Sequence, residues 1–156
     1  MIKAKLKVLP IEELANTITH GFGLMLSVIG LAVLIVLAGL NGDTWSLLSC
    51  VIYGVSLVVL YAASTFYHST TSHRAKKNLQ VVDHCCIYLL IAGSYTPFGM
   101  VIFNDPMGPK LMAGIWAFAL VGILIKLLIR DRFPAINVVS YLLMGWLGVF
   151  AVQPLF

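Results

Sequence analysis

Five long apolar segments separated by short polar stretches constrain the fold of this chain more than any other feature. A bilayer core about 30 Å thick needs roughly 20 apolar residues per helix, and each segment is about that long. A helix is also suited to this environment because it pairs its backbone amides and carbonyls within the segment. The sequence therefore predicts an all-α, polytopic transmembrane helix bundle. Its five predicted spans cover about 20–40, 45–67, 82–103, 110–129 and 135–153.

The composition excludes a soluble domain. Of the 156 residues, 60% are hydrophobic and 10% are charged, which is far more apolar than an average globular chain. The net charge of +4 does not indicate nucleic-acid binding, because the basic residues occur in small groups between the apolar segments. We expect one transmembrane domain, residues 20–156, surrounded by membrane lipids and preceded by a basic segment and a helix start in residues 1–19.

Local signals at the segment ends support this arrangement. Pro10 followed by Glu12 and Glu13 predicts a helix start near residue 10. The stretch Asn41-Gly42-Asp43 predicts the turn between the first two spans. In the third span, the polar and small residues from Gly93 to Pro97 predict close helix contact and a kink. We interpret the first apolar segment as a retained span and not as a signal peptide, because acidic and polar residues precede it.

The distribution of basic residues predicts the orientation. Loops rich in Lys and Arg stay in the cytoplasm, and nine of the ten such residues lie on one side of the predicted bundle. The tenth, Lys110, lies on the opposite side with Asp43 and Asp105. The N-terminus is therefore predicted inside. The nine are Lys3, Lys5, Lys7, Arg74, Lys76, Lys77, Lys126, Arg130 and Arg132.

Polar residues concentrate in residues 64–84, where the second span ends and the third begins. Ser64 and His68 are four residues apart and share a helix face, so the serine can hold one imidazole nitrogen. A basic loop of about a dozen residues would bring His68 close to Asp83. Such a pair could belong to a zinc site that activates water. Alternatively, it could be a hydrogen-bonded pair that fastens two helices without any ion.

A second polar stripe lies at the start of the first helix. Glu13, Asn16 and His20 are at positions i, i+3 and i+7, which places them on one helix face. They could support a catalytic site or simply make hydrogen bonds between helices. Of the remaining histidines, His84 is predicted in the helix interface and His73 in solvent.

The order and spacing of these residues resemble the bacterial hemolysin III family. The block from Asp83 to Phe98 carries most of the resemblance. The other matching motifs are Glu13-x-x-Asn16-x-x-x-His20-Gly21, Ser64-x-x-x-His68-Ser69 and Met144-Gly145-Trp146.

That family is similar to the progestin and adipoQ receptors and, more distantly, to alkaline ceramidases. The resemblance implies a seven-helix fold in the bacterial inner membrane, with zinc near the cytoplasmic face. His68 is then expected as a metal ligand, Asp83 and Ser64 as catalytic-site residues, and Glu13, Asn16 and His20 as supporting residues. The family's last two helices bring an His-x-x-x-His pair, but no histidine follows His84 here. The resemblance implies either a truncated chain or a short form whose zinc site is incomplete or is completed by another subunit in a homo-oligomer.

Three functions are compatible with these features. The first is a zinc-dependent hydrolase of lipid amides or esters, or a lipid sensor, with an incomplete metal site. The second is the cytolytic pore that the family name implies, although the second, fourth and fifth spans are almost continuously apolar. The third is a non-enzymatic receptor or regulator of lipid metabolism.

Overall fold

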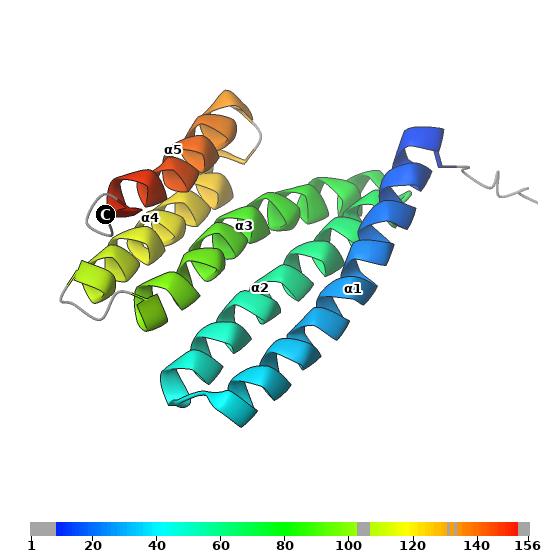
Figure 1. Ribbon diagram of the computed structural model, residues 1–156. Helices are drawn as coiled ribbons and strands as arrows, with labels where there is room; N and C mark the ends of the chain where they lie inside the picture. Colours follow the sequence, from blue (N-terminus) through cyan, green and yellow to red (C-terminus); the bar gives the residue numbers. More distant parts are fainter. Residues whose placement is uncertain (1–8, 103–106, 131, 133, 153–156) are drawn as a thin grey trace, which may run out of the picture.

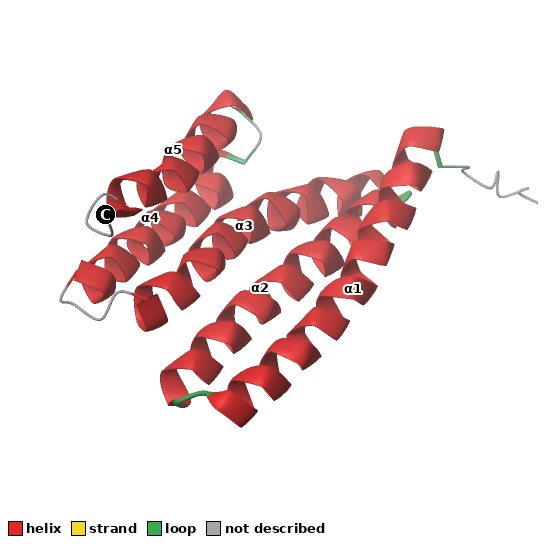
Figure 2. Cartoon of the chain, viewed as in Figure 1, coloured by secondary structure: helices red, strands yellow, loops and turns green. Residues whose placement is uncertain are grey.

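The computed structural model describes residues 9–102, 107–130, 132 and 134–152, and the regular structure in these residues is entirely helical (Figures 1 and 2). This confirms the predicted all-α class. A π-helix, η1 (Phe98–Ile102), continues from the end of α3. The α-helices are α1 (Ile11–Asn41), α2 (Thr44–Ser69), α3 (His73–Pro97), α4 (Met107–Ile129) and α5 (Pro134–Val152).

Helix α3 lies at the centre of the bundle. It packs against α2 on one side and against α4 and α5 on the other, while α1 packs against α2. Successive helices run in opposite directions (Figure 1). The starts of α1 and α3 therefore lie at the same end of the bundle as the end of α2. We call this the N-terminal end.

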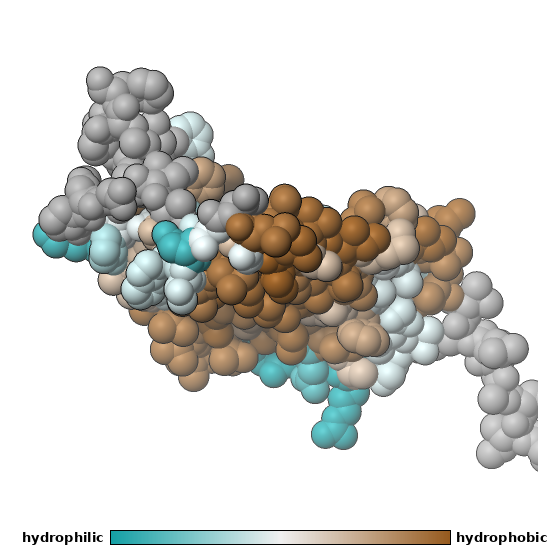
Figure 3. Space-filling view, turned by 60° about the horizontal axis from the view of Figure 1, so that its bottom comes forward, coloured by the Kyte–Doolittle hydropathy of each residue, from teal (hydrophilic) through white to brown (hydrophobic). Residues whose placement is uncertain are grey.

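The helices have the length and composition of a multi-pass membrane protein. Four are long and apolar enough to cross a bilayer, and the apolar part described for α5 is shorter, Ala135–Leu147. Figure 3 shows an apolar surface over the middle of one face, with polar residues toward its borders. The four candidate spans are Ile11–Leu40, Thr44–Ser69, His73–Met100 and Gly108–Ile129.

The turn between α1 and α2 confirms the prediction for residues 41–43. Helix α1 ends at Asn41, and Gly42 donates its backbone N–H to the carbonyl of Ala38 at 2.9 Å. Asp43 caps α2 by accepting the Ser46 backbone N–H at 2.8 Å. This hydrogen bond holds the pKa of the Asp43 carboxyl below its usual value. The turn thus satisfies amide groups that a helix start would otherwise leave unpaired.

The connection between α2 and α3 is much shorter than predicted. Only Thr70–Ser72 are non-helical, and Ser72 caps α3 through a 3.5 Å contact from the Ala75 N–H. The expected basic loop is therefore mostly the first turns of α3. Alanine and lysine are good helix formers, so a helix can extend beyond the apolar segment that defines the span.

Small residues bring the central helices close together, as the stretch from Gly93 to Pro97 predicted. A Cβ atom on Gly93 would collide with the Ser56 side chain, so only glycine permits this approach of α3 to α2. After Pro97 the helix changes to the π form of η1, which is consistent with the backbone N–H that proline lacks. The hydrophobic core lies between α3, α4 and α5. It contains Tyr88, Ala92, Ile115, Ala119 and Met144.

Candidate functional site

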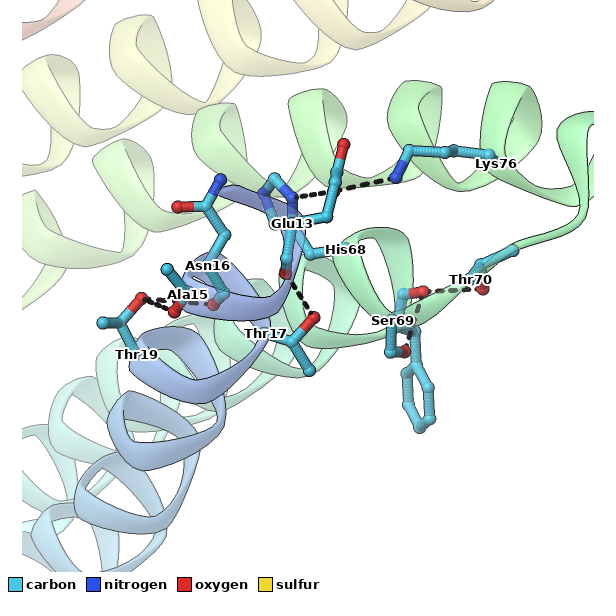
Figure 4. A network of polar contacts seen from close by, with 10 residues as sticks. Glu13, Ala15, Asn16, Thr17, Thr19, His68, Ser69, Thr70 and Lys76 are labelled. Atoms are coloured by element: carbon cyan, nitrogen blue, oxygen red, sulfur yellow. Dashed lines mark hydrogen bonds and ion pairs between the residues drawn. The ribbon is translucent and has the colours of Figure 1, made fainter. Parts of the chain in front are cut away.

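Three charged or titratable side chains from three helices meet at the N-terminal end. The Oε2 atom of Glu13 lies 2.8 Å from His68 Nδ1 and 2.8 Å from Lys76 Nζ (Figure 4). Since an ionised carboxylate only accepts hydrogen bonds, His68 donates its Nδ1–H and its Nε2 carries no proton in the neutral form. The three side chains are 15–26% exposed. We call these residues the Glu13 cluster.

Local sequence explains why the cluster forms. Glu13 is in the first turn of α1 and His68 is in the last turn of α2, where the helix dipole favours an anion and a cation respectively. The short turn at Gly42 makes α1 and α2 antiparallel neighbours. Gly23 also lets the two helices approach, because a Cβ there would meet the Tyr61 ring.

His20 lies beside the cluster, deeper in the bundle. Its ring centroid is 5.3 Å from that of His68 and 5.9 Å from that of Tyr61. Its Nδ1 atom is buried and has no hydrogen-bond partner among the described residues. Asn16 follows Glu13 along α1 (Figure 4) and precedes His20 by four residues. The structure thus brings the predicted polar stripe of α1 to His68.

The expected meeting of His68 with Asp83 is not present. No hydrogen bond or ion pair joins them in the described part of the chain, and the partner of His68 is Glu13. The reason is the early start of α3 at His73. With a rise of 1.5 Å per residue, Asp83 lies about 15 Å along the helix from that start. The end of α2 therefore lies beside Lys76 and not beside Asp83.

Ser64 is buried one helical turn below His68, with 3% of its surface exposed. It makes no hydrogen bond to His68 within the described structure. Asp83 is half-buried and follows Lys76 by seven residues, which places both on the same face of α3. Ser64 and Asp83 therefore belong to a deeper level than the Glu13 cluster.

The described residues do not form a complete metal site. Within them, no group of three or more His, Cys, Asp or Glu residues is arranged to hold an ion. Zinc in proteins normally has three or four protein ligands. We therefore derive no chemical step through zinc from the residues described here.

Sequence reasoning missed Lys76 as part of the site. It predicted Lys76 in a loop, whereas the residue lies on α3 and bridges to α1. Its Nζ also lies 5.0 Å from the centroid of the Tyr67 ring, a distance at which a cation is attracted to an aromatic face. The signal that could have revealed it is the helix-forming composition of residues 73–81.

A pocket of about 320 Å³ adjoins the Glu13 cluster at the end of the bundle. It opens where α1 begins and α2 gives way to α3. The lining residues are Leu9, Pro10, Glu13, Thr70, Thr71, His73 and Lys76.

Comparison of the sequence with known proteins identifies the family of this chain. A family model described as "Haemolysin-III related" matches residues 10–156. The chain belongs to this family. The resemblance predicted from the sequence motifs is thereby confirmed.

Two Bacillus proteins are among the similar relatives. The "Hemolysin-3 homolog" of Bacillus subtilis (strain 168) is 43% identical over 145 residues, which are 93% of this chain and 68% of the relative. The "Hemolysin-3" of Bacillus cereus is 41% identical over 145 residues, covering 93% of this chain and 66% of the relative. The chain thus spans about two thirds of the length of these relatives.

A human protein is also similar. The "Monocyte to macrophage differentiation factor" of Homo sapiens is 30% identical over 142 residues, which are 86% of this chain and 58% of the relative. No solved structure gives a significant match.

Proposed function

We propose that this protein acts on membrane lipids at the N-terminal end of the bundle, as a hydrolase of lipid amides or esters or as a lipid sensor. The observation that carries the proposal is the Glu13 cluster, a group of charged and titratable side chains beside a pocket at one end of a mostly apolar bundle. Ionisable groups are costly in a membrane and are therefore functional candidates by default.

The same end is proposed to face the cytoplasm of a bacterium, across its inner membrane. Arg74, Lys76 and Lys77 all lie in the first turns of α3. Arg130, at the end of α4, donates a hydrogen bond to Asn78 Oδ1 at 2.8 Å, so it lies at this end too. The resulting concentration of positive charge is typical of a cytoplasmic membrane face.

The cluster leaves one imidazole nitrogen available for chemistry. Because Glu13 fixes Nδ1 of His68, the Nε2 atom can accept a proton or bind a ligand. Ser64 and Asp83 lie deeper and would act on a group that enters between the helices. Zinc enters the proposal only with His68 as one ligand.

Metal content and lipid turnover test this function. The hydrolase alternative predicts that purified protein carries zinc that is lost in His68→Ala and kept in His73→Ala, as measured by elemental mass spectrometry. Incubation with a ceramide-like amide or an ester lipid should release fatty acid in a His68-dependent manner. Absence of zinc, together with identical lipid profiles for wild type and His68→Ala, would refute the hydrolase. Saturable lipid binding without product would instead support a receptor or sensor.

A cytolytic pore is a second candidate, because two relatives carry hemolysin names. A water-filled pore needs polar groups along its length. The described surfaces of α1 and α4 are instead dominated by exposed apolar side chains. We therefore expect no dye release from liposomes at defined protein content. Release that rises with protein concentration would favour the pore.

A further inference from the structure

The pocket beside the Glu13 cluster has the size and lining of a site for a small polar group. Its volume of about 320 Å³ is at the lower end of the range of roughly 300–1,000 Å³ that is usual for ligand sites. The lining combines one carboxylate, one ammonium, one imidazole and two threonine hydroxyls. Such a lining suits a ligand that carries both a positive and a negative charge.

The two charged side chains retain capacity for such a ligand. Both contacts of the Glu13 carboxylate use Oε2, and Oε1 has no partner among the described residues. Oε1 can therefore accept a hydrogen bond from a ligand ammonium. Lys76 Nζ has three N–H donors, one of which points to Glu13. Its other donors can meet an anionic oxygen of the same ligand.

The position of the pocket favours a lipid as the source of this ligand. The pocket lies at the polar end of helices that cross the membrane. Thr70, which lines it, donates its hydroxyl to the Phe66 carbonyl at 2.8 Å. Phe66 lies one turn deeper on the same face of α2 and is 62% exposed. A lipid with its headgroup in the pocket could therefore lay an acyl chain along Phe66.

We propose that this pocket binds the headgroup of a phospholipid that carries a primary amine, such as phosphatidylethanolamine. The ammonium is held by Glu13 Oε1, and the phosphate is held by Lys76 with His73 and Thr71 at its side. A choline headgroup has no N–H to donate to the carboxylate, and a glycerol headgroup leaves the carboxylate facing a phosphate. The inference rests on the part of the proposed function that brings lipid to this end, and requires neither turnover nor metal.

Lipid selectivity of the full chain tests the site. Native mass spectrometry in detergent would compare phosphatidylethanolamine, phosphatidylcholine and phosphatidylglycerol with identical acyl chains. We expect phosphatidylethanolamine to bind about tenfold more tightly than phosphatidylglycerol. Phosphatidylglycerol lacks the ammonium that contacts Glu13, so the Glu13 carboxylate repels its phosphate without compensation. Equal affinity for the three lipids would overturn the proposal, and this comparison needs no variant.

Matched lysine variants locate the site. Lys76→Gln should lower phosphatidylethanolamine affinity about tenfold, whereas Lys77→Gln, an exposed neighbour outside the pocket, should leave it unchanged. Equal losses in both variants would indicate general attraction to a basic surface and would overturn the assigned site. Circular dichroism verifies that both variants remain helical.

A soluble headgroup identifies the source of the ligand. Glycerophosphoethanolamine without acyl chains should compete weakly, because it lacks the contact along Phe66. Competition as strong as that of the intact lipid would refute a lipid site. Lipid selectivity that persists in protein without zinc or turnover would support the headgroup site while the hydrolase proposal fails. Lipid turnover without headgroup selectivity would support the hydrolase proposal and refute the headgroup site.

Discussion

Helix α3 takes part in two polar regions that are built in different ways. At its start, Lys76 joins the Glu13 cluster, whose side chains are charged or titratable and 15–26% exposed. In its middle, Tyr88 is 1% exposed and its hydroxyl pairs with the hydroxyl of Ser140 on α5. The first region uses ionic contacts, and the second uses neutral hydroxyl groups.

Other contacts of the central region follow the same rule. Tyr95 donates to the Gly145 carbonyl at 2.5 Å, and Trp116 Nε1 donates to Thr96 Oγ1 at 3.3 Å. Neutral hydrogen bonds suit the membrane interior, where an ion loses most of its hydration. Lys126 is the exception, because it is a charged residue with only 1% of its surface exposed.

The largest expected effect comes from overpacking the central region. A Cβ on Gly122 of α4 would fall against the Tyr88 ring, whereas one on Gly114 of the same helix would meet nothing within 4 Å. Gly122→Val should therefore lower the free energy of unfolding by about 1–3 kcal/mol. Gly114→Val serves as the control and should not be destabilising. Reversible unfolding in mixed detergent measures the free energy of unfolding of both variants. Equal losses of stability in Gly122→Val and Gly114→Val would show that helix packing at Tyr88 is loose.

A smaller effect is expected from removing the buried hydroxyl pair. Tyr88→Phe should cost about 1 kcal/mol, since neutral hydrogen bonds between membrane helices contribute roughly that much. The double variant with Ser140→Ala should lose less than the sum of the two single variants. Tyr53→Phe is the matched control. Salt should not change these free energies of unfolding, because neither hydroxyl is charged. If the losses of the two single variants add up in the double variant, the two hydroxyls do not form a direct pair.

The smallest effect is expected from the ionic cluster. Glu13→Gln should lower the free energy of unfolding by about 0.5 kcal/mol, because partly exposed ion pairs contribute little. The difference should shrink at high salt, which screens the interaction with Lys76. Glu12→Gln, an exposed neighbour, is the control and should show no effect. If Glu13→Gln lowers the free energy of unfolding more than Tyr88→Phe does at every salt concentration, the ionic cluster contributes more to stability than the hydroxyl pair, which contradicts this comparison.

Much of the candidate site was visible in the sequence. The spacing of Glu13, Asn16 and His20 predicted one polar face of α1, and the structure brings that face to His68. The assignments of Ser64, His68 and Asp83 to a site stay predictions. What the sequence did not predict was the pairing, in which His68 contacts Glu13 and not Asp83.

The sequence by itself determined the helical membrane architecture and the turn after Asn41, because apolar length, composition and capping residues are local properties. Only the tertiary structure decided the partners of the polar residues. The decisive detail was the start of α3 at His73, which is earlier than the sequence predicted. Because of this early start, Lys76 belongs to α3 and lies opposite Glu13. Helix starts in polar segments depend on weak propensities, so a small local difference changes which side chains meet across the bundle.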